Sequence, residues 1–118
     1  MAIKDNLIQK KSFEFSLSII RLFKRLQVER EYIISKQLLR SGTSIGANIE
    51  EAIAGQSKKD FLAKISISLK EARETKYWLR LLSESELTSI DVDYYLNEVH
   101  EIVNILSAIV KTTRSNLN

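Results

Sequence analysis

Residues 37–54 read QLLRSGTSIGANIEEAIA, a stretch in which apolar residues recur at helical spacing and small residues fill the positions between them. Their spacing places one apolar set on a single stripe of a helix, namely Leu38, Ile45, Ile49, Ala52 and Ile53. Gly42 and Gly46 lie inside the same helix, where each costs about 1 kcal/mol relative to Ala. Two glycines four residues apart therefore predict that another backbone approaches this face closely, so the rest of the chain is expected to pack around it.

The composition of the whole chain favours one helical domain. The 118 residues are 44% hydrophobic and 28% charged, with three glycines and neither proline nor cysteine. This length suits a single domain, residues 1–118, and the lack of proline permits long uninterrupted helices, so we expect the all-α class. Without cysteine, disulfides and thiolate metal sites are excluded. No apolar run reaches the roughly 18 residues of a membrane span and no signal peptide is recognisable, so we expect a cytoplasmic protein with no membrane partner.

Four segments with helical apolar periodicity follow one another along the chain. They predict helices at about residues 6–28, 31–54, 58–82 and 89–113. Each helix would be about 35 to 40 Å long at 1.5 Å per residue. Because the connections are short, consecutive helices should be antiparallel, and the expected fold is an up-down-up-down four-helix bundle.

Local signals mark some of the helix boundaries. Gly55 is expected to end the second helix in the left-handed conformation. Ser57, with Asp60 three residues later, resembles a capping box and starts the third helix at Lys58. A hydroxyl at residue 88 or 89 is expected to cap the fourth helix. The junction at residues 27–31 contains no helix breaker, so its boundary is weakly marked.

Residue types that support catalysis or metal binding are almost absent. His100 is the only histidine, and Asn97 occupies the position three residues before it, so the Glu-x-x-His pairs of a di-iron bundle are missing. No glycine-rich phosphate loop, dinucleotide fingerprint or Ser/His/Asp set is present. Glu50 and Glu51 are adjacent and point about 100° apart on a helix, unlike an acid/base pair. We expect no catalytic, metal or cofactor residues and no small-molecule substrate, hence no enzyme.

A row of polar residues follows one face of the second helix and is placed to meet carboxylates of the third. The members are Arg40, Ser44, Asn48 and Glu51, with Glu71 and Glu74 opposite. Buried polar groups must find hydrogen bonds or cost about 1 to 3 kcal/mol each. We therefore interpret the row as a structural motif that fixes the helix register.

Basic residues are unevenly placed, although the net charge is only +3. Residues 5–28 carry five basic and two acidic side chains, and residues 58–82 carry seven and three. Such asymmetry allows an anionic partner, while basic runs on helices are more often a solvated face. The candidates for contact with nucleic-acid phosphates are Lys10, Lys11, Lys24, Arg25, Lys58, Lys59, Lys64, Arg73, Lys76 and Arg80.

The first and third helices carry more apolar residues than one core can bury. The extra residues are Phe13, Leu17, Ile20 and Phe23 in the first helix, and Leu62, Ile67, Tyr77, Trp78 and Leu81 in the third. Exposed apolar patches are typical of interfaces, where Tyr and Trp are enriched. We therefore expect a homo-oligomer anchored by Tyr77 and Trp78. The alternative is that these side chains only cap the ends or edges of the bundle.

Two runs of the chain, residues 37–52 and 58–82, resemble the small bacterial family named for the 23S rRNA intervening sequence protein. The family pattern centres on a Ser, then Asn-Ile-x-Glu, then a Glu in the third helix, here Ser44, Asn48, Ile49, Glu51 and Glu74. The resemblance covers residues 10–113. It implies an up-down bundle and a homopentameric ring. Some members are encoded inside intervening sequences of ribosomal RNA genes, and a related branch, the accessory protein of diversity-generating retroelements, associates with a reverse transcriptase and nucleic acid.

The resulting hypothesis is a non-enzymatic, homo-oligomeric interaction module that binds RNA or DNA through basic faces of the first and third helices. The alternative is a protein-binding adaptor or structural assembly protein that binds no nucleic acid. Salt dependence separates the two, because phosphate contacts weaken steeply as salt rises and an apolar protein interface does not.

Overall fold

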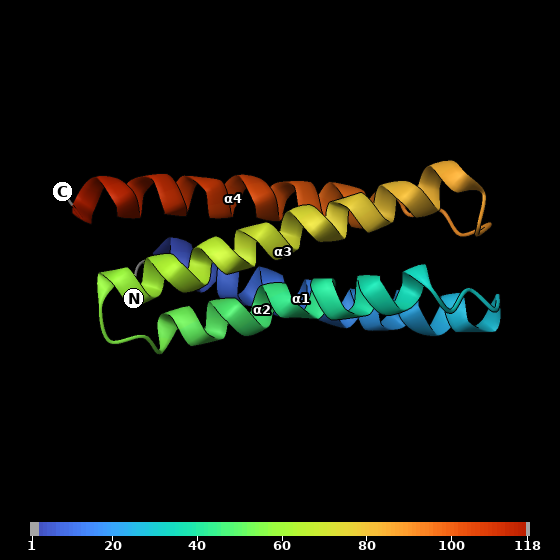
Figure 1. Cartoon of the computed structure of the whole chain (residues 1–118), viewed down its shortest axis with the longest axis horizontal. Helices are drawn as coiled ribbons and strands as arrows, with labels where there is room; N and C mark the ends of the chain where they lie inside the picture. The colour runs from blue at the N-terminus through green and yellow to red at the C-terminus, as the bar shows by residue number, and fades with distance from the viewer. Residues whose placement is uncertain (1–2, 118) are drawn as a thin grey trace.

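The protein is a bundle of four long helices. The computed structural model describes residues 3–117, with side chains from residue 7 onward. The helices are α1 (Ile3–Val28), α2 (Ile34–Ile53), α3 (Lys58–Ser85) and α4 (Asp93–Leu117), and the described residues form no strand. They run up, down, up and down, with both ends of the chain at the same end of a bundle of 48 × 21 × 21 Å (Figure 1). The predicted all-α four-helix bundle is confirmed. The expected domain, 1–118, includes residues 1, 2 and 118, which lie outside the described residues.

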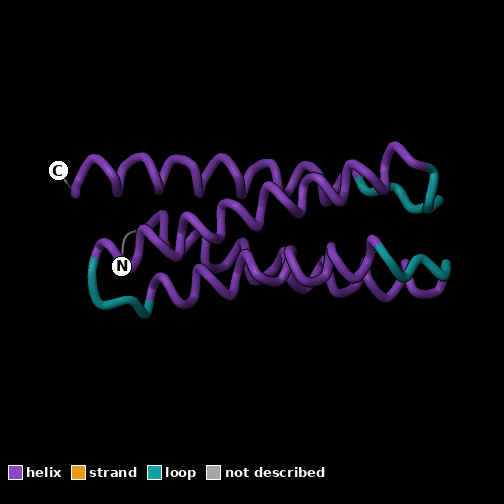
Figure 2. The backbone as a smooth tube through the Cα atoms, viewed as in Figure 1, coloured by secondary structure: helices purple, strands orange, loops and turns teal. Residues whose placement is uncertain are grey.

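The helices pack in a ring in which each helix contacts two others. The backbones of α1 and α3 each come close to those of α2 and α4, while the backbones of the diagonal pairs lie further apart. The connections at residues 29–33 and 86–92 lie at one end of the bundle, and the connection at residues 54–57 lies at the other (Figure 2). This arrangement gives α1 and α3 outward faces on opposite sides of the molecule.

One apolar core runs along the bundle axis. All four helices contribute side chains that are completely shielded from water, including Ile19, Leu22, Leu38, Ile45, Ile49, Ala72, Leu79, Val99 and Leu106. Full burial of a Leu or Ile side chain stabilises a fold by about 1.5 to 3 kcal/mol. The apolar stripe that the sequence predicts in residues 37–54 is part of this core, except for Ile53, which is only partly buried.

The ends of α2 differ from the sequence predictions. The helix begins at Ile34, not at residue 31, because Arg30 adopts a left-handed conformation (φ 64°) and Glu31 folds back to cap the helix. At the other end Gly55 does not adopt the expected positive φ. Its backbone N–H instead bonds to the Ala52 carbonyl at 3.1 Å. A Cβ on Gly55 would lie 3.0 Å from the same oxygen, so close approach explains the glycine.

α3 begins at Lys58, where the capping box places it. The Asp60 backbone N–H donates to Ser57 Oγ at 3.1 Å. The helix continues to Ser85, three residues beyond the predicted end, and stops at Glu86, which has a φ of 62°.

α4 begins at Asp93, later than the predicted residue 89. The hydroxyls of Thr88 and Ser89 bond to the Glu29 carboxylate at 2.6 and 3.0 Å. They therefore tie the two connections at this end of the bundle together, and neither caps the helix. At the other end α4 reaches Leu117, four residues beyond the prediction.

Candidate functional site

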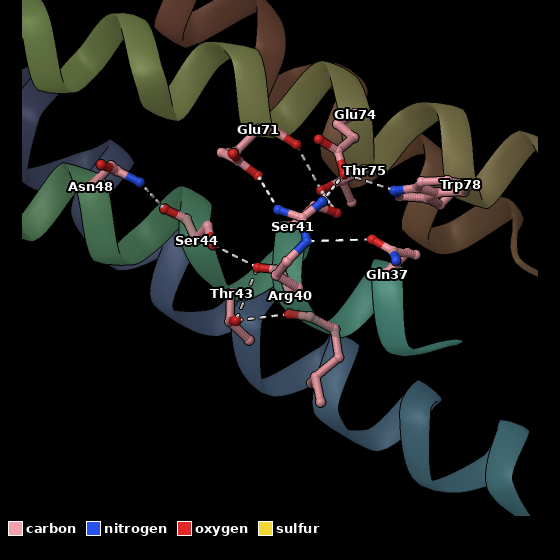
Figure 3. A network of polar contacts seen from close by, with 11 residues as sticks. Gln37, Arg40, Ser41, Thr43, Ser44, Asn48, Glu71, Glu74, Thr75 and Trp78 are labelled. Atoms are coloured by element: carbon pink, nitrogen blue, oxygen red, sulfur yellow. Dashed lines mark hydrogen bonds and ion pairs between the residues drawn. The ribbon is translucent and has the colours of Figure 1, made fainter. Parts of the chain in front are cut away.

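Two members of the polar row of α2 pair with side chains of α3, and Arg40 makes most of these contacts. Its guanidinium forms ion pairs with Glu71, at 3.2 Å, and with Glu74. Glu74 also accepts a hydrogen bond from the indole N–H of Trp78 at 3.0 Å. Figure 3 shows these side chains converging from the two helices. Arg40 therefore links α2 to α3.

The remaining members of the row are less buried than expected, and two of them, Ser44 and Asn48, are bonded within α2 itself. Ser44 Oγ donates to the Arg40 carbonyl at 2.6 Å, and Asn48 Nδ2 donates to the Ser44 carbonyl at 2.8 Å. Glu51 pairs with Lys64 at 3.4 Å, and the Glu51 side chain is 59% exposed. Because surface pairs of this kind contribute about 0 to 1 kcal/mol, little of the stability of the α2–α3 contact comes from Glu51.

Buried hydroxyls form the inner part of the α2–α3 contact. Thr75 Oγ1 and Ser41 Oγ are hydrogen-bonded at 2.8 Å, and Ser68 Oγ donates to the Ile45 carbonyl at 2.8 Å. Ser41, Ser68 and Thr75 are fully buried. Small side chains let the two helices come close enough for these bonds, which agrees with the sequence pattern of small residues on this face.

Three of the ten basic candidates are engaged in ion pairs. Lys11 bridges α1 to α4 by pairing with Glu98 at 2.8 Å and Glu101 at 2.7 Å. Burial alone would lower the pKa of Lys11, but the hydrogen bonds and charges of Glu101 and Glu98 outweigh it, so the pKa lies above its ordinary value. Lys64 pairs with Glu51, and Arg80 pairs with Glu84 at 3.4 Å.

The other seven candidates form no ion pair among the described residues, but they do not make one surface. Lys10, Lys24 and Arg25 lie on α1, and Lys58 and Lys59 lie in the first turn of α3. Arg73 and Lys76 lie further along α3. The basic candidates are thus spread over two helices that are diagonal in the bundle.

A groove between α3 and α4 brings Arg73 together with three basic residues that the sequence analysis missed. Its volume is about 610 Å³. The ribbons of α3 and α4 diverge toward the end of the bundle where α3 begins and α4 ends (Figure 1). It is lined by Ser66, Leu69, Lys70, Arg73, Ser107, Val110, Lys111, Arg114 and Ser115. The available signal was the i, i+3 spacing of two cations in each helix, but their meeting depends on the packing of α3 against α4.

Exposed apolar side chains lie on α1 and α3. Phe13 is 62% exposed, and Leu17 and Ile20, which follow it at steps of four and three, are more than a third exposed. On α3, Tyr77 is 54% exposed and packs edge-on against Trp78 at a centroid distance of 5.2 Å. Trp78 itself is half-buried against the core. Tyr77 is thus the more accessible of the two predicted interface residues.

The described part of the chain lacks both a metal-binding cluster and a membrane-spanning helix. No group of three or more His, Asp or Glu side chains there is arranged to hold a metal ion. None of the four helices combines the length and the apolar character that crossing a membrane requires. His100 is exposed.

Comparison with known proteins places this architecture in context. Residues 4–108 match the family model described as the 23S rRNA-intervening sequence protein. The chain is 48% identical in sequence to a protein of unknown function from the S23 ribosomal protein family of Bacteroides thetaiotaomicron, for which there is a crystal structure. It superimposes with a TM-score of 0.86 and covers 92% of this chain and 99% of that one. No curated protein matches the chain.

Proposed function

Since the chain belongs to the 23S rRNA-intervening sequence protein family, we propose that it is a non-enzymatic module that assembles with copies of itself and binds nucleic acid. The assembly part is carried by one observation, the exposed apolar side chains on α1 and α3. A cytoplasmic location belongs to the same proposal and is supported by the absence of cysteine.

The exposed apolar residues have the arrangement of an interface. Phe13, Leu17 and Ile20 form a continuous stripe on the side of α1 that faces away from the core. A stripe of three large apolar side chains is uncommon on a monomer, where exposed apolar residues are usually scattered singly. The water that contacts this stripe would be released if a second copy covered it, which favours association.

The position of the stripe indicates how copies would meet. α1 and α3 are diagonal in the bundle, so the stripe on α1 and Tyr77 on α3 face away from each other. Contact between α1 of one copy and α3 of the next is heterologous, and such contacts generate a closed ring when the rotation between copies closes. The homopentamer is the ring that the family resemblance implies.

Sedimentation equilibrium at micromolar concentration tests the assembly. We expect a mass well above the 13.6 kDa of the single chain. Phe13→Glu combined with Tyr77→Glu should lower the mass while the far-ultraviolet circular dichroism stays helical. Tyr94→Glu is the matched control, because Tyr94 is a similarly exposed aromatic residue on α4, at 58%. A wild-type mass of 13.6 kDa would contradict the proposal.

Nucleic-acid binding rests on the unpaired basic side chains and on a sequence pI of about 9.2. The alternative, an adaptor that binds only protein, predicts no binding of RNA or DNA at low salt. Gel retardation over a salt series separates the two, because binding through phosphates weakens linearly in log affinity with log salt. Absence of retardation at about 50 mM salt would favour the adaptor.

A further inference from the structure

The groove between α3 and α4 gathers positive charge without any counter-charge. The residues that line it include the cations Lys70 and Arg73 of α3 and Lys111 and Arg114 of α4, and no carboxylate. None of the four cations forms an ion pair within the described residues. The net charge of the whole chain is only +3, so the groove carries more positive charge than the chain as a whole.

The contact between α3 and α4 also differs from the other three helix contacts. α1 is joined to α2 by Gln9 and Glu50, and to α4 by Lys11. α2 is joined to α3 by Arg40 and by buried hydroxyls. Over residues 7–117, no side-chain hydrogen bond or ion pair joins α3 to α4. The polar groups of this groove are therefore not used to hold the fold together.

The floor and walls of the groove suit an anion with oxygen acceptors. Leu69 and Val110, both buried, form an apolar floor. The hydroxyls of Ser66 and Ser107 are half-buried beside the cations and can donate hydrogen bonds to phosphate oxygens. Four like charges in one groove repel one another, and a bound anion would remove that repulsion.

The spacing of the cations fits more than one phosphate group. Lys70 and Arg73 are three residues apart, as are Lys111 and Arg114, so each pair extends about 4.5 Å along its helix. No aromatic side chain lines the groove. Bases therefore have no aromatic platform for stacking there, and recognition would be mainly of the backbone and largely independent of sequence.

We propose that the α3–α4 groove binds two neighbouring phosphate groups of a nucleic-acid strand through Lys70, Arg73, Lys111 and Arg114. This inference rests on the proposed nucleic-acid binding and gives it a single site, which differs from the spread of basic residues that the sequence indicates. Arg73 is the one residue common to both.

The test compares two variants that lose the same charge. The groove variant combines Lys70→Gln, Arg73→Gln, Lys111→Gln and Arg114→Gln. The control variant combines Lys10→Gln, Lys24→Gln, Lys58→Gln and Lys59→Gln, which are exposed and unpaired in the described structure. Fluorescence anisotropy with a short labelled single-stranded RNA is measured between about 50 and 200 mM salt. Because no changed residue forms an ion pair in the fold, both variants should keep the wild-type circular dichroism. The groove variant should melt no lower than wild type, since loss of its four like charges relieves their repulsion.

The groove variant should bind the RNA at least about tenfold more weakly than wild type, for every RNA sequence tried. The slope of log affinity against log salt should shrink by about 1.4, which is about 0.7 for each of two phosphates. The control variant should change both quantities much less. If the two variants lose RNA affinity equally, or if the groove variant keeps the wild-type affinity, the inference is wrong. The proposal that the protein binds nucleic acid would still stand.

A second probe tests whether the groove binds phosphate groups, independently of whether the protein binds RNA. Inorganic tripolyphosphate presents neighbouring phosphate groups without bases or sugars, and it should raise the melting temperature of the wild type but not of the groove variant. If tripolyphosphate has this effect while RNA does not bind, the groove is a phosphate site and the nucleic-acid part of the proposed function fails. If neither probe binds the wild type, both the inference and that part fail.

Discussion

The two glycines inside α2 show how single residues set the distance between α1 and α2. A Cβ on Gly42 would lie 3.0 Å from Ile19 Cγ2 and 3.1 Å from Ile19 Cγ1. A Cβ on Gly46 would lie no closer than 3.4 Å to any atom, the nearest being Ser16 Oγ. The tight neighbour of Gly42 is thus a side chain, and the backbone approach that the sequence predicts is found at Gly46, where a Cβ would lie 3.5 Å from the Ser12 carbonyl oxygen.

Alanine at these two positions should have opposite effects on stability. Gly46→Ala should raise the free energy of unfolding by up to about 1 kcal/mol, because alanine is the better helix former and there is room for the methyl group. Gly42→Ala should lower it by about 1 kcal/mol, because Ile19 is fully buried and β-branched and cannot turn aside. Urea unfolding at one fixed protein concentration measures both. Stabilisation by Gly42→Ala would show that Ile19 can shift.

The start of α2 depends on the Glu31 side chain. Its carboxylate accepts hydrogen bonds from the backbone N–H groups of Ile33, Ile34 and Ser35 at 2.6 to 3.1 Å. Glu31 is only 8% exposed. The negative charge at a helix N-terminus also interacts favourably with the helix dipole. One acidic residue therefore satisfies the donors that the first turn of α2 leaves free.

Replacing Glu31 should destabilise the bundle more than an average surface change. Glu31→Ala leaves three backbone donors without their acceptor, and loss of a helix cap costs about 0.5 to 2 kcal/mol. Glu84→Ala is a suitable control, since the Glu84 side chain is 69% exposed and pairs only with Arg80, and it should change stability by less than about 0.5 kcal/mol. Equal urea midpoints for the two variants would show that water replaces the cap.

The helices themselves could be predicted from the sequence, whereas their ends and the groove could not. Apolar periodicity is a property of each segment, and a local capping box gave the start of α3 at Lys58. The start of α4 was predicted too early because Thr88 bonds to Glu29, a residue 59 positions away. The groove depends in the same way on which flank of α3 faces α4, which no local pattern contains. The helix ends and the groove therefore depend on contacts between residues far apart in the sequence, which apolar periodicity does not reveal.

At the scale of the whole molecule, two carboxylates join parts of the chain that are far apart in sequence. Glu29 accepts hydrogen bonds from Thr88 and Ser89 and so connects the two loops at one end. Glu101 pairs with Lys11 and so connects α4 to α1, which closes the ring of helices. Both contacts are stronger when the carboxylate is ionised, so the stability of the fold is coupled to pH.

The pKa values of both carboxyl groups are lowered by these contacts. For Glu29 the main cause is the hydrogen bond from Thr88, and for Glu101 it is the hydrogen bond from Lys11. A carboxyl group whose pKa is lower in the folded state stabilises the fold above its unfolded pKa. That stabilisation is lost as the pH falls through the folded value. The free energy of unfolding should therefore be steady near neutrality and decline below about pH 4.5, the ordinary value of both groups.

Urea unfolding at a series of pH values tests this dependence. The double variant Glu29→Gln, Glu101→Gln should be less stable at neutral pH and should show a shallower decline between about pH 4.5 and 3, because two of the groups that take up protons on unfolding are gone. Glu14→Gln is the control, since the Glu14 carboxylate forms no ion pair or hydrogen bond with the described residues. This variant should show the same decline in the free energy of unfolding at low pH as the wild type. If the double variant declines as steeply as the wild type, other carboxylates drive the acid unfolding and the two long-range contacts are dispensable at low pH.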